Sequence, residues 1–132
     1  LINGELRVAD LPEAWRAKMR ELLGVEPKTD KEGVLQDVHW SQAAFGYFPT
    51  YTLGNLYSAQ FVAAAKQQDS LIESELTNGN STPLLAWLHD NIHRHGSKYD
   101  PAQLCERATG NTLTAQPFVD YVRGKYGALY AL

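Results

Sequence analysis

Signals that begin and end helices recur along the whole chain, and they constrain its fold more than any other feature. Thr82-Pro83 and Asp100-Pro101 each place a capping side chain directly before a proline, which is the pattern of a first helical turn. Gly110 follows a periodic apolar segment and is a typical C-terminal stop. No segment alternates apolar and polar residues with the two-residue period of a strand. The sequence therefore predicts an all-α fold.

Apolar residues at helical spacing define the individual helices. A capping box of Asp10 and Glu13 is expected to start the first helix, and Gly24 to end it. We predict a single helical domain or fragment covering residues 1–132, with no internal repeat and no domain boundary. The predicted helices cover approximately residues 10–24, 31–43, 50–68, 70–76, 82–96, 100–110 and 116 onward.

Composition indicates a globular protein. A chain of 132 residues with 44% hydrophobic and 20% charged residues can bury one core. The net charge is −3 without a basic block, so nucleic acid is not an expected partner. No apolar run approaches the roughly 20 residues needed to cross a membrane. Cys105 is the single cysteine, which excludes an intrachain disulfide and favours a reducing, cytoplasmic location.

The segment from Gln36 to Gly54 is the most unusual part of the sequence. It crowds two tyrosines and two phenylalanines around Gly46 and Pro49, which break regular structure and predict a turn that leads into a helix. One interpretation is a hydrophobic anchor under a loop. The other is a rigid cluster whose phenolic OH groups recognise a ligand. The phenolic groups are those of Tyr47 and Tyr51.

This segment resembles the signature of the carboxypeptidase Taq family, the M32 metallocarboxypeptidases. The matching strings are H-W-S at residues 39–41, F-G-Y-F-P-T-Y at 45–51 and L-G at 53–54. Residues 4–6 and 10–15 resemble the family segment before the signature, and residues 87–88, 91–96 and 108–110 resemble its closing helices. Ala43 is a departure, because family members often carry Gly there. The resemblance implies the C-terminal portion of a larger, mainly helical metallopeptidase.

The metal motif of that family, H-E-x-x-H, is absent from this sequence. The chain also begins at Leu1 without Met, so we expect a piece of a longer enzyme that is inactive alone and holds no metal. The resemblance implies that zinc, or another divalent ion such as cobalt, acts in the full-length enzyme with the motif's Glu as general base. The expected partners are a peptide substrate, the remainder of the polypeptide and a homodimer.

This segment would then line the substrate cleft. Tyr47 and Tyr51 would provide donors for the substrate's terminal carboxylate or for the developing oxyanion, and His39 would donate likewise or orient one of them. The sequence assigns no catalytic residue within the chain. An alternative remains open, namely a freestanding helical binding or scaffold domain without catalytic activity.

One pair of histidines mimics a metal motif. His89 and His93 stand four residues apart on a predicted helix, with Asp90 where a metalloprotease has Glu. The Asp side chain is shorter by one methylene, His95 lies on another helical face, and no third ligand is evident. We therefore predict no metal site here, but an amphipathic helix with His93 near its C-terminal end.

Overall fold

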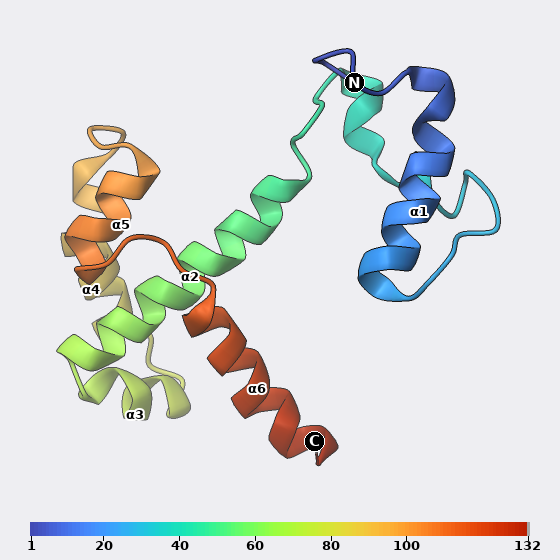
Figure 1. The fold of residues 1–132 in the computed structure, drawn as a ribbon. Helices are drawn as coiled ribbons and strands as arrows, with labels where there is room; N and C mark the ends of the chain where they lie inside the picture. The colour runs from blue at the N-terminus through green and yellow to red at the C-terminus, as the bar shows by residue number, and fades with distance from the viewer. Residues whose placement is uncertain (132) are drawn as a thin grey trace. The chain divides into compact units, whose positions relative to one another are not determined.

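The computed structural model describes residues 1–131, and this part of the chain is all-α, as the sequence predicts (Figure 1). Six α-helices and several 3-10 turns are present, and no strand occurs within residues 1–131. The chain divides into two compact units, residues 1–48 and the residues from 49 onward, each with its own packing. The single domain expected for residues 1–132 stays a prediction. None of the described helices combines the length and apolarity needed to cross a bilayer.

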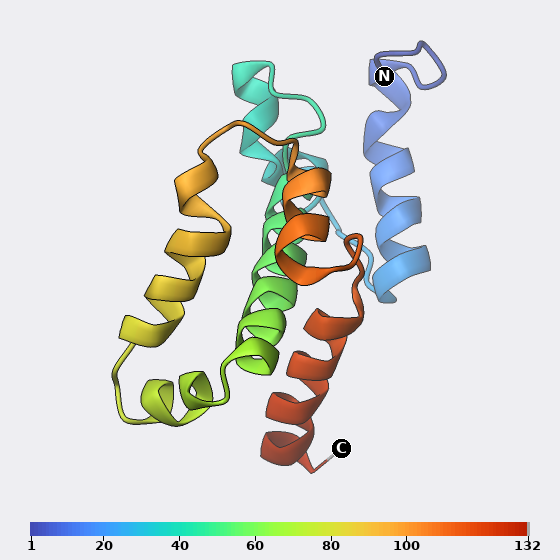
Figure 2. The ribbon, with the colours of Figure 1, turned by 90° about the vertical axis from the view of Figure 1, so that its left-hand side faces the viewer.

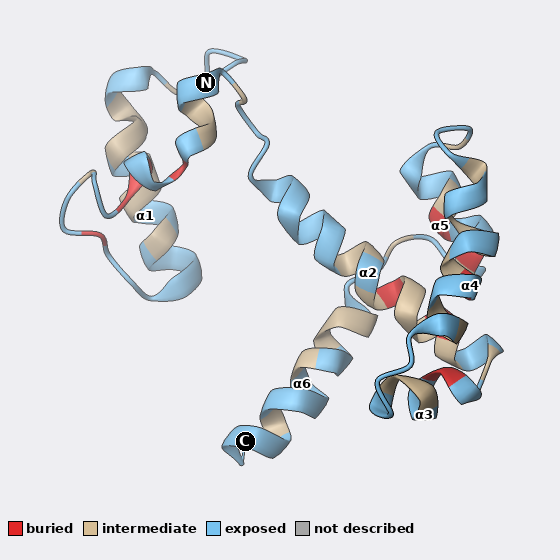
Figure 3. Cartoon of the chain, turned by 180° about the vertical axis from the view of Figure 1, so that it is seen from behind, coloured by how far each residue is buried: buried red, intermediate tan, exposed pale blue. Residues whose placement is uncertain are grey.

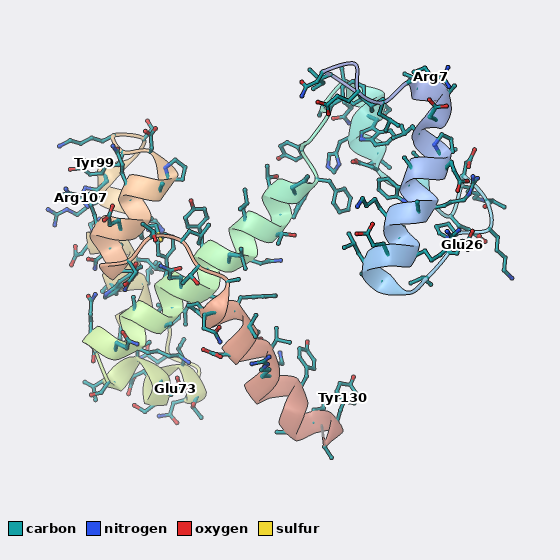
Figure 4. All side chains as sticks on the ribbon, viewed as in Figure 1. Arg7, Glu26, Glu73, Tyr99, Arg107 and Tyr130 are labelled. Carbon is teal, nitrogen blue, oxygen red and sulfur yellow. The ribbon has the colours of Figure 1, made fainter. Side chains whose placement is uncertain are left out.

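The first unit is built around α1 (Leu11–Leu23), which carries Pro12 in its first turn and ends at Gly24 as predicted. Gly24 has a left-handed φ of 66°, and its N–H donates to the carbonyl of Arg20 at 3.1 Å. The Arg20 guanidinium donates two hydrogen bonds to Glu26, at 2.6 and 2.9 Å. These bonds hold the pKa of the Glu26 carboxyl (labelled in Figure 4) below its ordinary value. The pair thus fastens the connector that follows α1.

Two tryptophans pack the 3-10 turn Val38–Gln42 against α1. The Trp40 ring meets Trp15 edge-on, with centroids 6.0 Å apart and planes at 87°. Gly33 lies beside this pair, where a Cβ atom would come within 3.1 Å of Pro27 and 3.3 Å of Trp15. Such distances are too close for a larger side chain without displacement. Close packing therefore selects glycine at position 33.

The predicted capping box of α1 is wrong. The carboxylate of Asp10 accepts hydrogen bonds of 2.6 and 2.8 Å from the guanidinium of Arg7, and it makes no cap bond to α1. Asp10 itself ends a 3-10 turn (Val8–Asp10). A charged partner three residues away therefore takes the oxygen atoms that would otherwise satisfy the first N–H groups of the helix.

The helix predicted over residues 31–43 is also wrong. The structure has two 3-10 turns there, Val34–Gln36 and Val38–Gln42, with Asp37 between them. Asp37 has φ −80° and ψ 89°, which is not helical, and its carboxylate accepts the N–H of His39 at 3.1 Å. An aspartate that binds a nearby backbone N–H competes with helical hydrogen bonding. The first 3-10 turn therefore ends before Asp37 and a second one begins after it, so the segment is not one continuous helix.

The second unit is organised by α2 (Pro49–Gln68), and the helices that follow pack against it (Figures 1 and 2). Its buried side chains lie on the C-terminal half of α2 and on α3, α4 and α5 (Figure 3). Ala64, Ala65 and Ala108 form the hydrophobic cluster of this unit together with Ile72 and Trp87, and these small side chains allow the helices to approach closely. The bounds are α3 (Leu71–Thr77), α4 (Thr82–Asn91), α5 (Pro101–Thr109) and α6 (Gln116–Tyr130).

The helices α4 and α5 begin where the sequence predicts, whereas α4 ends earlier than predicted. Proline stands in the first turn of α4 and begins α5, as the Thr-Pro and Asp-Pro signals predict. Gly110 ends α5 with a φ of 76°. The helix predicted to reach Gly96 instead ends at Asn91, because Ile92 has φ −122° and ψ −65° and a 3-10 turn (His93–His95) follows. His93 therefore lies outside α4.

Cys105 is fully buried in α5. Its Sγ lies 3.7 Å from the carbonyl oxygen of Asn111. Burial raises the pKa of the thiol above its ordinary value. A thiol of this kind is a structural side chain and a poor nucleophile.

A buried amide joins α2 to the segment between α5 and α6. Gln60 is only 4% exposed. Its Nε2 donates to the carbonyl of Thr112 at 3.0 Å and to the hydroxyl of Thr109 at 3.2 Å. Its Oε1 accepts the N–H of Thr114 at 2.9 Å. One side chain thus satisfies polar groups about 50 residues away in sequence.

We expect the substitution Gln60→Leu to lower the free energy of unfolding by about 1–3 kcal/mol, because it keeps the volume but removes the partner of the Thr112 carbonyl and of the Thr114 N–H. Urea denaturation of the variant measures this loss. Gln67→Leu is the control, because Gln67 is exposed on the same helix and should change stability by less than about 0.5 kcal/mol. Equal midpoints for the two variants would contradict the assigned role of Gln60.

Candidate functional site

The aromatic segment forms a turn at the end of the first unit. Ala43 and Gly46 both have left-handed backbone, with φ of 57° and 76°. The N–H of Ala43 donates to the carbonyl of Trp40 at 3.0 Å. The reversal brings Phe45 back to Trp40, with ring centroids 6.2 Å apart. The predicted turn is therefore present, and the Phe45 ring packs on the tryptophan that contacts Trp15 of α1.

Ala43 occupies a conformation that suits glycine, the residue that we expect in related sequences at this position. A left-handed backbone costs an L-residue about 1–2 kcal/mol. Glycine avoids this steric cost, but it loses more conformational entropy on folding, which offsets part of the gain. We expect Ala43→Gly to raise the free energy of unfolding by about 0.5–1 kcal/mol. Urea denaturation checks the gain against Ala44→Gly, where φ is not left-handed and no gain is expected. Equal behaviour of the two variants would contradict this explanation.

His39 is held by a buried carboxylate. Its Nδ1 lies 2.7 Å from Oδ1 of Asp37, and its backbone N–H donates to the same oxygen at 3.1 Å. The Asp37 side chain is 6% exposed, and that of His39 is 17% exposed. A carboxylate only accepts hydrogen bonds, so the ring nitrogen that faces it carries a proton. The contact therefore fixes which imidazole nitrogen is the donor within the pair.

Two rings of the signature lie against His39. The Tyr47 ring centroid is 5.0 Å from the imidazole, and that of Phe48 is 5.5 Å away in an edge-on arrangement. The Tyr47 residue is 49% exposed. The structure thus brings two of the three sequence-predicted candidates, His39 and Tyr47, into one cluster with Asp37.

The third candidate, Tyr51, belongs to the second unit. It lies in the first turn of α2 and is 56% exposed. Neither tyrosine is buried in its unit as an ordinary core residue would be. The side chains nevertheless make contacts of their own, so their exposure does not leave them without partners.

The side chains of this cluster can donate hydrogen bonds to a negatively charged group. A phenol and an imidazole can each donate to a carboxylate or to an oxyanion. A buried aspartate behind the imidazole fixes the ring by a charge-assisted hydrogen bond. The arrangement suits recognition of an anionic group on a ligand. Asp37, which sequence reasoning missed, could have been found from the Asp-x-His spacing, because an aspartate two residues before another residue commonly caps its N–H.

The described residues do not provide a metal site. Within residues 1–131, no three His, Cys, Asp or Glu side chains gather as metal ligands would. His89 contacts its neighbour Asp90, with 3.1 Å between Nδ1 and Oδ1, whereas the His95 ring packs on Tyr99. The interruption at Ile92 also removes the helical spacing between His89 and His93. Among the described residues, these histidines are therefore not gathered as the ligands of one metal ion.

Comparison with known proteins decides the family. A family profile described as "Carboxypeptidase Taq (M32) metallopeptidase" matches residues 1–126. The chain belongs to the carboxypeptidase Taq family. Thermostable carboxypeptidase 1 of Thermus thermophilus is 51% identical over 130 residues, which are 98% of this chain and 26% of that protein. Carboxypeptidase 1 of Bacillus subtilis is 39% identical over 132 residues, which are 100% of this chain and 26% of that protein.

Solved structures of the M32 family share the fold. The crystal structure of the M32 carboxypeptidase from Deinococcus radiodurans R1 has a TM-score of 0.87 and 44% identity, over 99% of this chain and 27% of that chain. The chain therefore spans about a quarter of the length of these M32 relatives. The resemblance expected from the residues of the aromatic segment is confirmed.

Proposed function

We propose that residues 1–132 are the C-terminal part of a metal-dependent carboxypeptidase and form one helical domain that lines its substrate cleft. Membership of the M32 family and relatives that are carboxypeptidases support the reaction, which is the hydrolysis of C-terminal residues from peptides. The observation that carries the proposal is the cluster of Asp37, His39 and Tyr47 on the family signature. It offers hydrogen-bond donors of the kind that recognise a carboxylate or stabilise an oxyanion.

In this proposal Tyr47, Tyr51 and His39 bind the substrate or the transition state. The divalent metal, zinc or another ion such as cobalt, is held by residues outside this chain. Peptides and the remainder of the polypeptide are the partners, and a homodimer is a further expectation. The single cysteine, Cys105, supports a reducing location such as the cytoplasm.

Exposed apolar side chains support the view that this chain is one part of a larger enzyme. The N-terminal half of α2 and most of α6 are exposed (Figure 3), including Leu53 at 45% and Leu129 at 67%. Large exposed apolar surface is typical of a region that contacts another part of the protein.

The test is release of C-terminal residues from a synthetic peptide by the full-length polypeptide and by residues 1–132 alone. We expect the full-length protein to release them, a chelator to abolish release, and added zinc or cobalt to restore it. We expect no release by residues 1–132 alone. A full-length protein that hydrolyses no peptide after metal is added would refute the proposal and favour a binding or scaffold domain.

A further inference from the structure

Asp37 has an environment that the family signature does not explain. Its side chain is 6% exposed, and a buried carboxylate is costly unless it is paired and hydrogen-bonded. Within residues 1–131, no Lys or Arg forms an ion pair with it. Its Oδ1 instead accepts two hydrogen bonds from one residue, His39, at 2.7 Å from Nδ1 and 3.1 Å from the backbone nitrogen. The carboxylate is therefore dedicated to this histidine.

The consequence for His39 follows from hydrogen-bond chemistry. Because a carboxylate cannot donate, we infer that Nδ1 carries the proton, so Nε2 is the ring nitrogen that Asp37 does not engage. The ring is also bounded by Tyr47 at 5.0 Å and Phe48 at 5.5 Å between centroids. The imidazole is thus fixed in its protonation pattern by Asp37 and in its plane by two aromatic rings.

We propose that Asp37 is a positioning residue for the peptidase reaction, which holds His39 so that its Nε2 hydrogen-bonds the peptide substrate. This inference rests on the proposed function. A fixed imidazole loses less freedom when it binds than a mobile one, so the carboxylate behind it improves binding and orientation without touching the substrate. Asp37 is thereby added to the tyrosines and the histidine of the signature as a residue that contributes to the site.

Two substitutions of His39 separate the proposed role from a structural one. Asn places its amide nitrogen near the position of Nδ1, so H39N keeps the bond to Asp37 but has no Nε2. Gln places its amide near the position of Nε2, so H39Q keeps a group there but loses the bond to Asp37. If the pair only stabilised the turn, H39N would keep activity.

The experiment compares these variants in the full-length enzyme by the release of C-terminal residues. We expect kcat/KM to fall at least about tenfold in H39N and in D37N. The double variant D37N/H39N should be no slower than H39N alone, because Asp37 acts only through His39. D30N is the matched control, since Asp30 pairs with Arg16 in the same unit and should leave kcat/KM unchanged.

A second readout does not depend on turnover. Nitrogen-15 NMR of His39 in the full-length enzyme should show protonated Nδ1, and D37N should change that pattern. Wild-type kcat/KM in H39N, or an unprotonated Nδ1 in the wild type, would overturn the inference while the proposed function stands. If D37N does not fold, H39N and the wild-type spectrum still decide. A wild-type enzyme that releases no residue would instead refute the proposed function itself.

Discussion

Replacing Trp87 by alanine is expected to lower the free energy of unfolding by about 3–5 kcal/mol. Trp87 is 8% exposed and belongs to the buried cluster that joins α2, α3, α4 and α5. Its Nε1–H donates to Oε1 of Gln68 at 2.8 Å. The alanine variant would therefore lose the ring contacts, leave a cavity beside Ile72 and Ala65, and leave the Gln68 oxygen without its donor.

Urea denaturation measures this effect, and two further variants assign it. Trp87→Phe keeps most of the ring volume and should cost about half as much or less, through the lost hydrogen bond and the smaller ring. Leu85→Ala is the surface control on α4, because Leu85 is 57% exposed and should change stability by no more than about 0.5 kcal/mol. A loss below about 1 kcal/mol for Trp87→Ala would show that the helices of the second unit are not held by this cluster.

The parts of the fold that were predictable depend on local chemistry. Proline after Thr82 or Asp100 has a fixed φ and no N–H, so α4 and α5 begin near these residues whatever surrounds them. Gly24 and Gly110 end their helices in left-handed backbone for the same local reason. Elements of this kind can be read from a few neighbouring residues.

The errors arise where a side chain had a choice of partner. Asp10 binds Arg7 and leaves α1 without a capping bond, and Asp37 binds His39 and divides a predicted helix. Ile92 ends α4 early because its backbone leaves the helical region. Periodicity describes only the apolar face and carries no information about which polar partner a carboxylate takes.

The candidate site was only partly predictable for a similar reason. Tyr47, Tyr51 and His39 were found because the signature resembles a known family, whereas Asp37 lies outside the matched strings. The role of Gln60 was also missed, because its partners Thr112 and Thr114 are about 50 residues away in sequence. Pairings over such distances depend on how α2 meets the segment after α5.

The central proposal is that a phenolic OH of the signature takes part in catalysis, and removing it should have a large effect. Tyr47→Phe and Tyr51→Phe keep the ring and delete only the OH. If that OH stabilises the transition state, kcat/KM should fall at least about tenfold, equivalent to about 1.4 kcal/mol, with little loss of stability. Tyr126→Phe on α6 is the matched control, because Tyr126 lies far from the signature in sequence and stacks on Tyr130.

The most direct measurement is therefore kcat/KM for release of a C-terminal residue by the full-length enzyme and its three tyrosine variants, at equal metal content. We expect kcat/KM to fall at least about tenfold in Tyr47→Phe, in Tyr51→Phe or in both, and to be unchanged in Tyr126→Phe. Wild-type kcat/KM in both signature variants would contradict this expectation, and the aromatic segment would then be a structural anchor.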